Sequence, residues 1–274
     1  MAQMINADHG VYVFIEHSEG NIKESSLLII CEGRRLAQRL GEELSVILLG
    51  KDLKNLSQQL NVYGVDKALL VENSLLENYI PEIYANVLIE IATQYRPSVI
   101  LFATTPIGSE LASRVASKLS KGIITNCKEF VVSRDGSLTI RKPICDEKVD
   151  ATVTFLNGKP FIATINPDFL ELEKARETKE PWTIEFKPAI DKDKIRIRSM
   201  EYIKADPKTV DVSEADVVVG IGKGLGSEEH LDIINKLADL LGASIGGSRI
   251  ARDKGWIPYS SQIGSSGKKI SPKL

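Results

Sequence analysis

Short apolar runs alternate with longer amphipathic segments over the first half of the chain. The runs typical of buried strands lie at Tyr12–Ile15, Ser45–Gly50, Lys67–Val71 and Ser98–Ala103. Apolar residues recur at helical spacing over Ser25–Leu40, Pro81–Tyr95 and Ile107–Leu119. Ser98–Ala103 is almost continuously apolar, as expected for a strand whose sheet is covered by helices on both faces. This alternation predicts an N-terminal α/β domain with a parallel sheet.

The pattern changes in the middle of the chain. Phe130–Ile140 contains Asp135-Gly136 between two strand-like runs, and Ala151–Ile165 contains Asn157-Gly158 in the same position. Both dipeptides tolerate the positive φ angles of tight hairpin turns. The first domain is therefore expected to end in antiparallel β hairpins.

A charged, proline-containing stretch separates this region from a second pattern. From Glu171 to Asp211 the sequence has little sustained periodicity, although Ile195–Ile203 has the composition of one strand. We interpret the stretch as a partly ordered connection between two domains. The predicted boundaries are residues 1–205 for the first domain and 206–274 for the second.

The second domain begins with a strand, a glycine-rich loop and a helix. The strand is predicted at Asp216–Gly220, and the helix runs from about Ser227, a candidate N-cap, to Leu241, before Gly242. The residues expected on the buried face of the helix are Leu231, Ile234, Leu237, Ala238 and Leu241. We expect a doubly wound, Rossmann-like domain that is incomplete at its C-terminus.

The loop Gly222–Gly226 has the features of a phosphate-binding site, because free backbone N–H groups and the dipole of the following helix both favour an anion. Its glycines do not follow the G-x-G-x-x-G spacing, which argues against a nicotinamide dinucleotide. Lys223 at the tip favours an anionic ligand. A tight turn without a ligand remains the alternative.

Two later segments carry further candidate chemistry. Ser248-Arg249 follows a short predicted strand, so it lies at the carboxyl edge of the sheet, where ligands bind in open α/β folds. The alternative is a surface arginine paired with Asp253. Gln262–Lys268 is a polar loop rich in glycine and hydroxyls. All of these loops are expected at the same rim of one sheet.

Composition narrows the class of protein. The chain is 43% hydrophobic and 26% charged, with a formal net charge of −2, which gives no sign of nucleic-acid binding. Its cysteines and histidines are dispersed without metal-ligand spacing, and no apolar run is long enough to span a membrane. A cytoplasmic protein of two domains, without a metal, is expected.

The C-terminal motifs resemble those of electron-transfer flavoprotein alpha subunits. That family carries Gly-Ala-Ser-Arg, Asp-x-Gly-Trp-x-Pro and Gln-Val-Gly-Gln-Thr-Gly-Lys segments in this order and spacing. Here they stand as Gly246–Arg249, Asp253–Pro258 and Gln262–Lys268. Looser likeness, as at Ile140–Pro143, extends over nearly the whole chain. The family continues beyond the position of Leu274 with a further strand, so the resemblance implies a truncated second domain.

The resemblance implies an FAD site shared with a beta subunit that binds mainly the first domain. Arg249 would stabilise negative charge on the reduced flavin, and Ser266, where the family has threonine, would bond the flavin N5 region. The residues implied to bind the cofactor are Lys223, Ser248, Arg249, Gln262, Ile263, Gly264, Ser265 and Ser266. Lys223 stands where the family usually has arginine, so it lacks the bidentate fork.

The function implied is that of an electron carrier without substrate turnover of its own. It would take electrons from flavin dehydrogenases, such as acyl-CoA dehydrogenases, and pass them to a downstream acceptor. A non-redox adenine-nucleotide-binding or scaffold protein remains the alternative. A nicotinamide-dependent dehydrogenase is disfavoured by the glycine spacing of the loop at 220–226.

Overall fold

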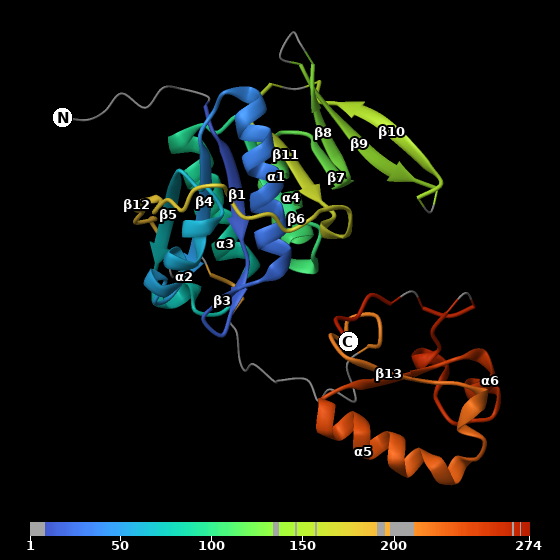
Figure 1. The fold of residues 1–274 in the computed structure, drawn as a ribbon. Helices are drawn as coiled ribbons and strands as arrows, with labels where there is room; N and C mark the ends of the chain where they lie inside the picture. Colours follow the sequence, from blue (N-terminus) through green and yellow to red (C-terminus); the bar gives the residue numbers. More distant parts are fainter. Residues whose placement is uncertain are drawn as a thin grey trace. The chain divides into compact units, whose positions relative to one another are not determined.

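The computed structural model describes residues 9–133, 137–145, 147–156, 158–190, 195–197, 211–264, 266–268 and 270–274. The chain forms two compact units, Met1–Ser199 and Met200–Leu274, each with its own layers (Figure 1). The predicted domain boundary between residues 205 and 206 lies outside the described residues.

A seven-stranded sheet organises the larger unit, in the order β12-β5-β4-β1-β6-β11-β7. Every neighbouring pair in it is parallel. Its strands are β1 (Val11–Ile15), β4 (Leu44–Gly50), β5 (Lys67–Glu72), β6 (Val99–Ala103), β7 (Ile123–Cys127), β11 (Phe161–Ile165) and β12 (Trp182–Glu185). The prediction of a parallel α/β sheet is confirmed, including the strands expected at β1, β4, β5 and β6.

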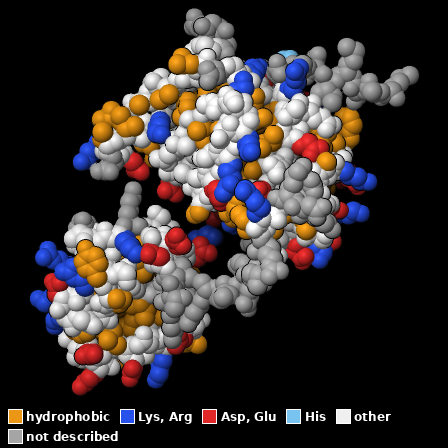
Figure 2. Space-filling view, turned by 180° about the vertical axis from the view of Figure 1, so that it is seen from behind, with side chains coloured by type: hydrophobic (Ala, Val, Ile, Leu, Met, Phe, Trp, Pro, Cys, Tyr) orange, Lys and Arg blue, Asp and Glu red, His pale blue; other side chains and the backbone are white. Residues whose placement is uncertain are grey.

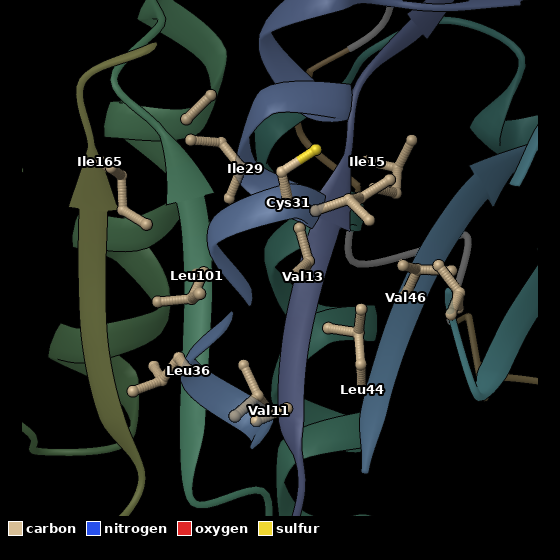
Figure 3. Close-up of a cluster of buried hydrophobic side chains, with 14 of the residues drawn as sticks. Val11, Val13, Ile15, Ile29, Cys31, Leu36, Leu44, Val46, Leu101 and Ile165 are labelled. Carbon is tan, nitrogen blue, oxygen red and sulfur yellow. The ribbon is translucent and has the colours of Figure 1, made fainter. Parts of the chain in front are cut away.

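Helices cover both faces of this sheet. They are α1 (Glu24–Leu40), α3 (Pro81–Tyr95) and α4 (Pro106–Lys118), with the short α2 (Lys54–Gln59) beside the small hairpin of β2 (His17–Ser18) and β3 (Asn21–Ile22). Short 3₁₀ turns lie in the connecting segments at η1 (Leu60–Val62), η2 (Ser74–Leu76) and η3 (Pro167–Phe169). Val11, Val13 and Ile15 of β1 point to the face that α1 covers (Figure 3). Phe14, which lies between Val13 and Ile15 in the sequence, belongs to the cluster with side chains of α3 and α4 on the opposite face.

The antiparallel region contains one correct and one wrong prediction. Strands β8 (Glu129–Val132), β9 (Leu138–Ile144) and β10 (Val149–Thr154) form a separate antiparallel sheet, which confirms the first expected strand pair. Its Asp135-Gly136 turn lies outside the described residues, as does Asn157. The second hairpin does not form, because β10 pairs with β9 whereas β11 runs parallel to β6 and β7. Ile162–Ile165 is fully buried, which suits a central parallel strand better than a hairpin arm.

The connection after β11 is more ordered than its composition suggests. Trp182–Glu185 forms β12, which adds a parallel strand at the edge of the sheet beside β5, and Phe186 is buried against the same unit. The strand expected at Ile195–Ile203 is absent from residues 195–197, and the rest of that range lies outside the described residues.

The smaller unit is built on two parallel strands, β13 (Val218–Ile221) and β14 (Ser244–Gly247). They are joined by the 3₁₀ turns η5 (Lys223–Leu225) and η6 (Glu228–His230) and by helix α5 (Leu231–Leu241), and are followed by α6 (Arg249–Asp253) and η7 (Tyr259–Ser261). Gly242 ends α5 in the left-handed region, as predicted. Ser227 instead precedes the turn η6, and its side chain makes no capping bond.

The buried face predicted for α5 is too wide. Leu231 and Ile234 pack against the small cluster of this unit and Ala238 is buried, but Leu237 and Leu241 are 43% and 44% exposed. Two strands cover only a narrow stripe of a helix, so the flanking apolar positions stay at the surface. Figure 2 shows hydrophobic side chains among charged ones on the visible face of this unit. No helix among the described residues is long and apolar enough to cross a membrane.

Glu32 is a buried carboxylate on α1, and it predicts a pH-dependent loss of stability. It is 6% exposed, and burial raises the pKa of its carboxyl although Arg35 lies 3.7 Å away. The charged form is therefore disfavoured in the folded state, so stability falls as the pH rises through the raised pKa. Glu32→Gln should match the parent in acid and be more stable than it at neutral pH. Thermal unfolding between pH 4 and 8 measures this, and parallel pH profiles for the two proteins would contradict it.

The cysteines predict a single reactive thiol. Cys31 and Cys127 are buried, and burial raises the pKa of Cys127 to about 12, whereas Cys145 is exposed. Because the thiolate is the reactive species, Cys145 should react first with a disulfide reagent in the folded protein. Thiol titration before and after unfolding checks this, with Cys145→Ser as the control that removes the fast phase.

Candidate functional site

Loops from distant parts of the smaller unit meet at the carboxyl edge of β13 and β14. The two strands are parallel, so Gly222 and Ser248, which follow them, leave the sheet on the same side. The Ser248 amide donates to the Ile221 carbonyl oxygen at 2.9 Å. Gln262 forms a parallel bridge to Gly247, and the Ile263 amide donates to the Gly247 carbonyl at 2.9 Å. The structure thus brings together the loops that the sequence places at one rim.

The glycines before Ser248 allow this close approach. A Cβ atom built on Gly247 would lie 2.7 Å from Ile257 Cδ1 and 3.1 Å from Ala251 Cβ. One on Gly246 would lie 3.1 Å from the Ile263 side chain. Small residues are therefore required for Ile257 and Ile263 to pack on opposite sides of β14.

The Gln262–Lys268 loop closes on itself. The Lys268 amide donates to the Gln262 carbonyl at 2.8 Å, and the Gly264 amide donates to the Lys268 carbonyl at 3.2 Å. Gly267 lies so close to this closure that its Cβ would stand 2.4 Å from the Gln262 carbonyl oxygen. Ile263 is half-buried and Gly264 and Ser266 are exposed on the loop, while Ser265 lies outside the described residues.

Two buried polar atoms of the site lack a protein partner. Ser248 Oγ and Gln262 Oε1 are both shielded from solvent without a hydrogen bond to any described residue. Burying an unpaired polar atom costs about 1–3 kcal/mol. A Cβ atom at Gly222 would stand 3.7 Å from Ser248 Oγ, so the glycine leaves this hydroxyl unobstructed on that side. Such orphaned atoms indicate a polar ligand.

Arg249 and Lys223 supply positive charge at the same edge. The Arg249 side chain is 68% exposed, and its Nε lies 3.8 Å from Asp253 Oδ2. Asp253 is held more closely by Arg252, whose Nε donates at 3.1 Å, so the ion pair considered as the alternative for Arg249 exists but is loose. Lys223 is exposed and forms no ion pair with the residues described by the structure.

Asp211 is a residue of this site that sequence reasoning missed. Its carboxylate accepts from Lys268 Nζ and from the Ser213 hydroxyl at 2.6 Å. The Lys268 ammonium, together with Ser213, holds the pKa of the Asp211 carboxyl well below its usual range. An aspartate in a charged connection carries no signal of its own, because its partner lies 57 positions away.

Comparisons with known proteins assign both units. A family model described as the electron transfer flavoprotein domain matches residues 11–191. A second, described as the electron transfer flavoprotein FAD-binding domain, matches residues 211–274.

The curated relatives agree with these models. The chain is 33% identical to the electron transfer flavoprotein subunit alpha of Thermoanaerobacterium thermosaccharolyticum, over 96% of this chain and 80% of that protein. It is 35% identical to the protein FixB of Bradyrhizobium diazoefficiens, over 96% and 73% of the two chains. It is 31% identical to LctC of Acetobacterium woodii, a subunit of a lactate dehydrogenase (NAD(+),ferredoxin), over 97% of this chain and 63% of that one.

The residues present fit FAD. The flavin ring and the phosphates of FAD are rich in hydrogen-bond acceptors. The carboxyl edge of β13 and β14 offers the cations Arg249 and Lys223 and the hydroxyls of Ser248 and Ser266. The unpartnered Ser248 Oγ and Gln262 Oε1 give buried polar positions that a heteroaromatic ligand can satisfy. The individual roles of these side chains stay predictions.

The packing around Gly247 predicts a rescue by a second substitution. Gly247→Ala inserts a methyl group 2.7 Å from Ile257 Cδ1, and such overpacking costs about 1–3 kcal/mol of unfolding free energy. Ile257→Val removes that atom, so the double variant should lose less stability than the sum of the single losses. Denaturation followed by Trp256 fluorescence, in a Trp182→Phe background, measures the coupling. Additive losses would contradict it.

Proposed function

Because the chain belongs to the electron-transfer flavoprotein alpha-subunit family, we propose that it carries electrons on FAD from flavin dehydrogenases to a downstream acceptor. Acyl-CoA dehydrogenases are the proposed class of donor. The work of such a protein is to hold and tune the cofactor rather than to bind a substrate, so it needs no catalytic acid or base. It has no substrate turnover of its own in this proposal.

One observation carries the proposal. At the edge of β13 and β14 the orphaned Ser248 Oγ and Gln262 Oε1 lie on the loops that also present Arg249 and Ser266. An anion alone would need only the cations. The unpartnered buried atoms favour a ligand with several directed hydrogen-bonding groups, which the flavin provides.

FAD, when bound, supplies a ring that takes up and releases electrons. Arg249 keeps its charge in any surroundings and would favour added negative charge on a neighbouring ring. Ser248 and the backbone of Ile263, Gly264 and Ser265 would line the cofactor, with Gln262 beneath them. Lys223, at the turn after β13, would contact a phosphate as a single point charge.

The larger unit is the proposed binding surface for a beta subunit. Members of this family work with a beta subunit and redox partners, and we extend this to a heterodimer formed mainly through residues 1–205. Residues 206–274 would then hold the cofactor. The donor and acceptor are set by surfaces that meet these partners.

A non-redox nucleotide-binding or scaffold role is not favoured, because the relatives are named for electron transfer. The absorption spectrum of the protein, purified alone and with its beta subunit, distinguishes the two functions. Visible flavin bands that bleach on reduction support the electron carrier. A colourless protein in both preparations would contradict the proposal and favour the nucleotide-binding or scaffold role.

The charge of Arg249 predicts a change in reduction potential. A charge-assisted contact is worth about 1.5–3 kcal/mol, so Arg249→Gln should lower the one-electron potential of bound FAD by roughly 60–130 mV. Arg249→Lys should lower the potential by less than Arg249→Gln does, because the positive charge remains. Arg252→Gln is the matched control, since Arg252 is engaged by Asp253 and Tyr259. Spectroelectrochemical titration measures the potentials, and equal shifts for Arg249→Gln and Arg252→Gln would refute the specific role.

A further inference from the structure

The Gln262 side chain is fixed beneath the loop that it begins. Its residue is 3% exposed, its carbonyl accepts the Lys268 amide at 2.8 Å, and its backbone bridges to Gly247. A side chain that starts from a backbone held on two sides and is enclosed in this way has few rotamers available. It can therefore impose a geometry on what it touches.

Gln262 touches Ser266 twice. Its Nε2 lies 3.0 Å from Ser266 Oγ and also contacts the Ser266 carbonyl oxygen. A carbonyl oxygen can only accept, so the group facing Ser266 is the amide NH₂, a donor. Ser266 Oγ consequently accepts a hydrogen bond from Gln262.

This acceptance fixes the direction of the serine proton. A hydroxyl has one proton and two lone pairs, and the lone pair facing Gln262 is occupied. The O–H must therefore point away from Gln262. Ser266 is exposed, so its proton is available to a ligand that approaches from solvent.

We propose that Gln262 is a positioning residue that acts through Ser266, holding its hydroxyl as a hydrogen-bond donor toward FAD. The inference rests on the proposed function of this site. It explains how a serine serves at this position without the methyl group of threonine, which would restrict the rotamer. The amide of Gln262 restricts the hydroxyl instead.

A double-mutant cycle tests the inference. The dissociation constant for FAD is measured by flavin fluorescence quenching on the complex with the beta subunit, for Gln262→Met, Ser266→Ala and the pair. Methionine keeps the length of glutamine without the donor. Each single change should weaken binding roughly three- to tenfold, the effect of one hydrogen bond. The double variant should bind more tightly than the product of the two single effects predicts, because the part of the Gln262 effect that passes through the Ser266 hydroxyl is lost only once.

The cycle separates positioning from a structural role, because Ser266→Ala keeps the carbonyl oxygen that Gln262 also contacts. If Gln262 merely braced the loop, or bound FAD only through its own Oε1, its substitution would weaken binding by the same factor in the parent and in the Ser266→Ala background. Multiplied effects would therefore overturn the inference. Ser260→Ala, at an exposed serine of η7, is the matched control and should leave the constant unchanged.

Gln262→Glu tests whether the direction of the Ser266 hydroxyl matters for FAD binding. A carboxylate accepts from Ser266 and reverses the direction of its hydroxyl, so this variant should bind more weakly than Gln262→Met. The reverse order would count against the inference while leaving FAD binding by the parent protein intact. A parent complex that binds no FAD would instead overturn the proposed function, and with it the inference.

Discussion

The smaller unit depends on the close approach of backbone segments around Gly246 and Gly247. Without side chains there, β14 can be flanked by Ile257 on one side and Ile263 on the other, and the Gln262–Lys268 loop reaches the carboxyl edge of the sheet. The placement of Ser248, Arg249 and Gln262 follows from that packing. It sets Ser248 beside the end of β13, starts α6 at Arg249 and fixes Gln262.

The larger unit depends instead on the burial of its parallel sheet on both faces. Its central strands are apolar on both faces, so helices must cover both, and the result is a body with one buried cluster on each face of the sheet. The buried Glu32 on α1 shows the cost of keeping a charge within such a body. A sheet covered in this way suits the partner binding proposed for the larger unit, whereas the loops of the smaller unit suit the proposed cofactor tuning. The two units thus divide the proposed work between them.

The sequence predicted elements where local pattern and tertiary environment agree. Tyr12–Ile15 and Ser98–Ala103 could be recognised because burial on both faces leaves an unbroken apolar run. Asn157-Gly158 led to the wrong prediction of a second hairpin. A dipeptide that favours a turn does not determine which sheet the following strand joins. In α5 the periodicity showed an apolar face but not how much of it two strands could cover. At the site, motif order brought the loops together, while Asp211 and the Gln262–Ser266 bond depend on distances that only the fold defines.

The Asp211–Lys268 pair bears on where the smaller unit begins. Lys268 closes the Gln262–Lys268 loop through its backbone and holds it to Asp211 through its side chain, so this loop is fixed to the end of the connecting stretch. A dissected domain that starts after Asp211 would lack this contact. One that starts at Asp211 itself would place a new α-ammonium group next to the same carboxylate, in competition with Lys268. A dissected domain that is meant to keep the Asp211–Lys268 pair therefore has to begin ahead of Asp211, although its first strand begins only at Val218.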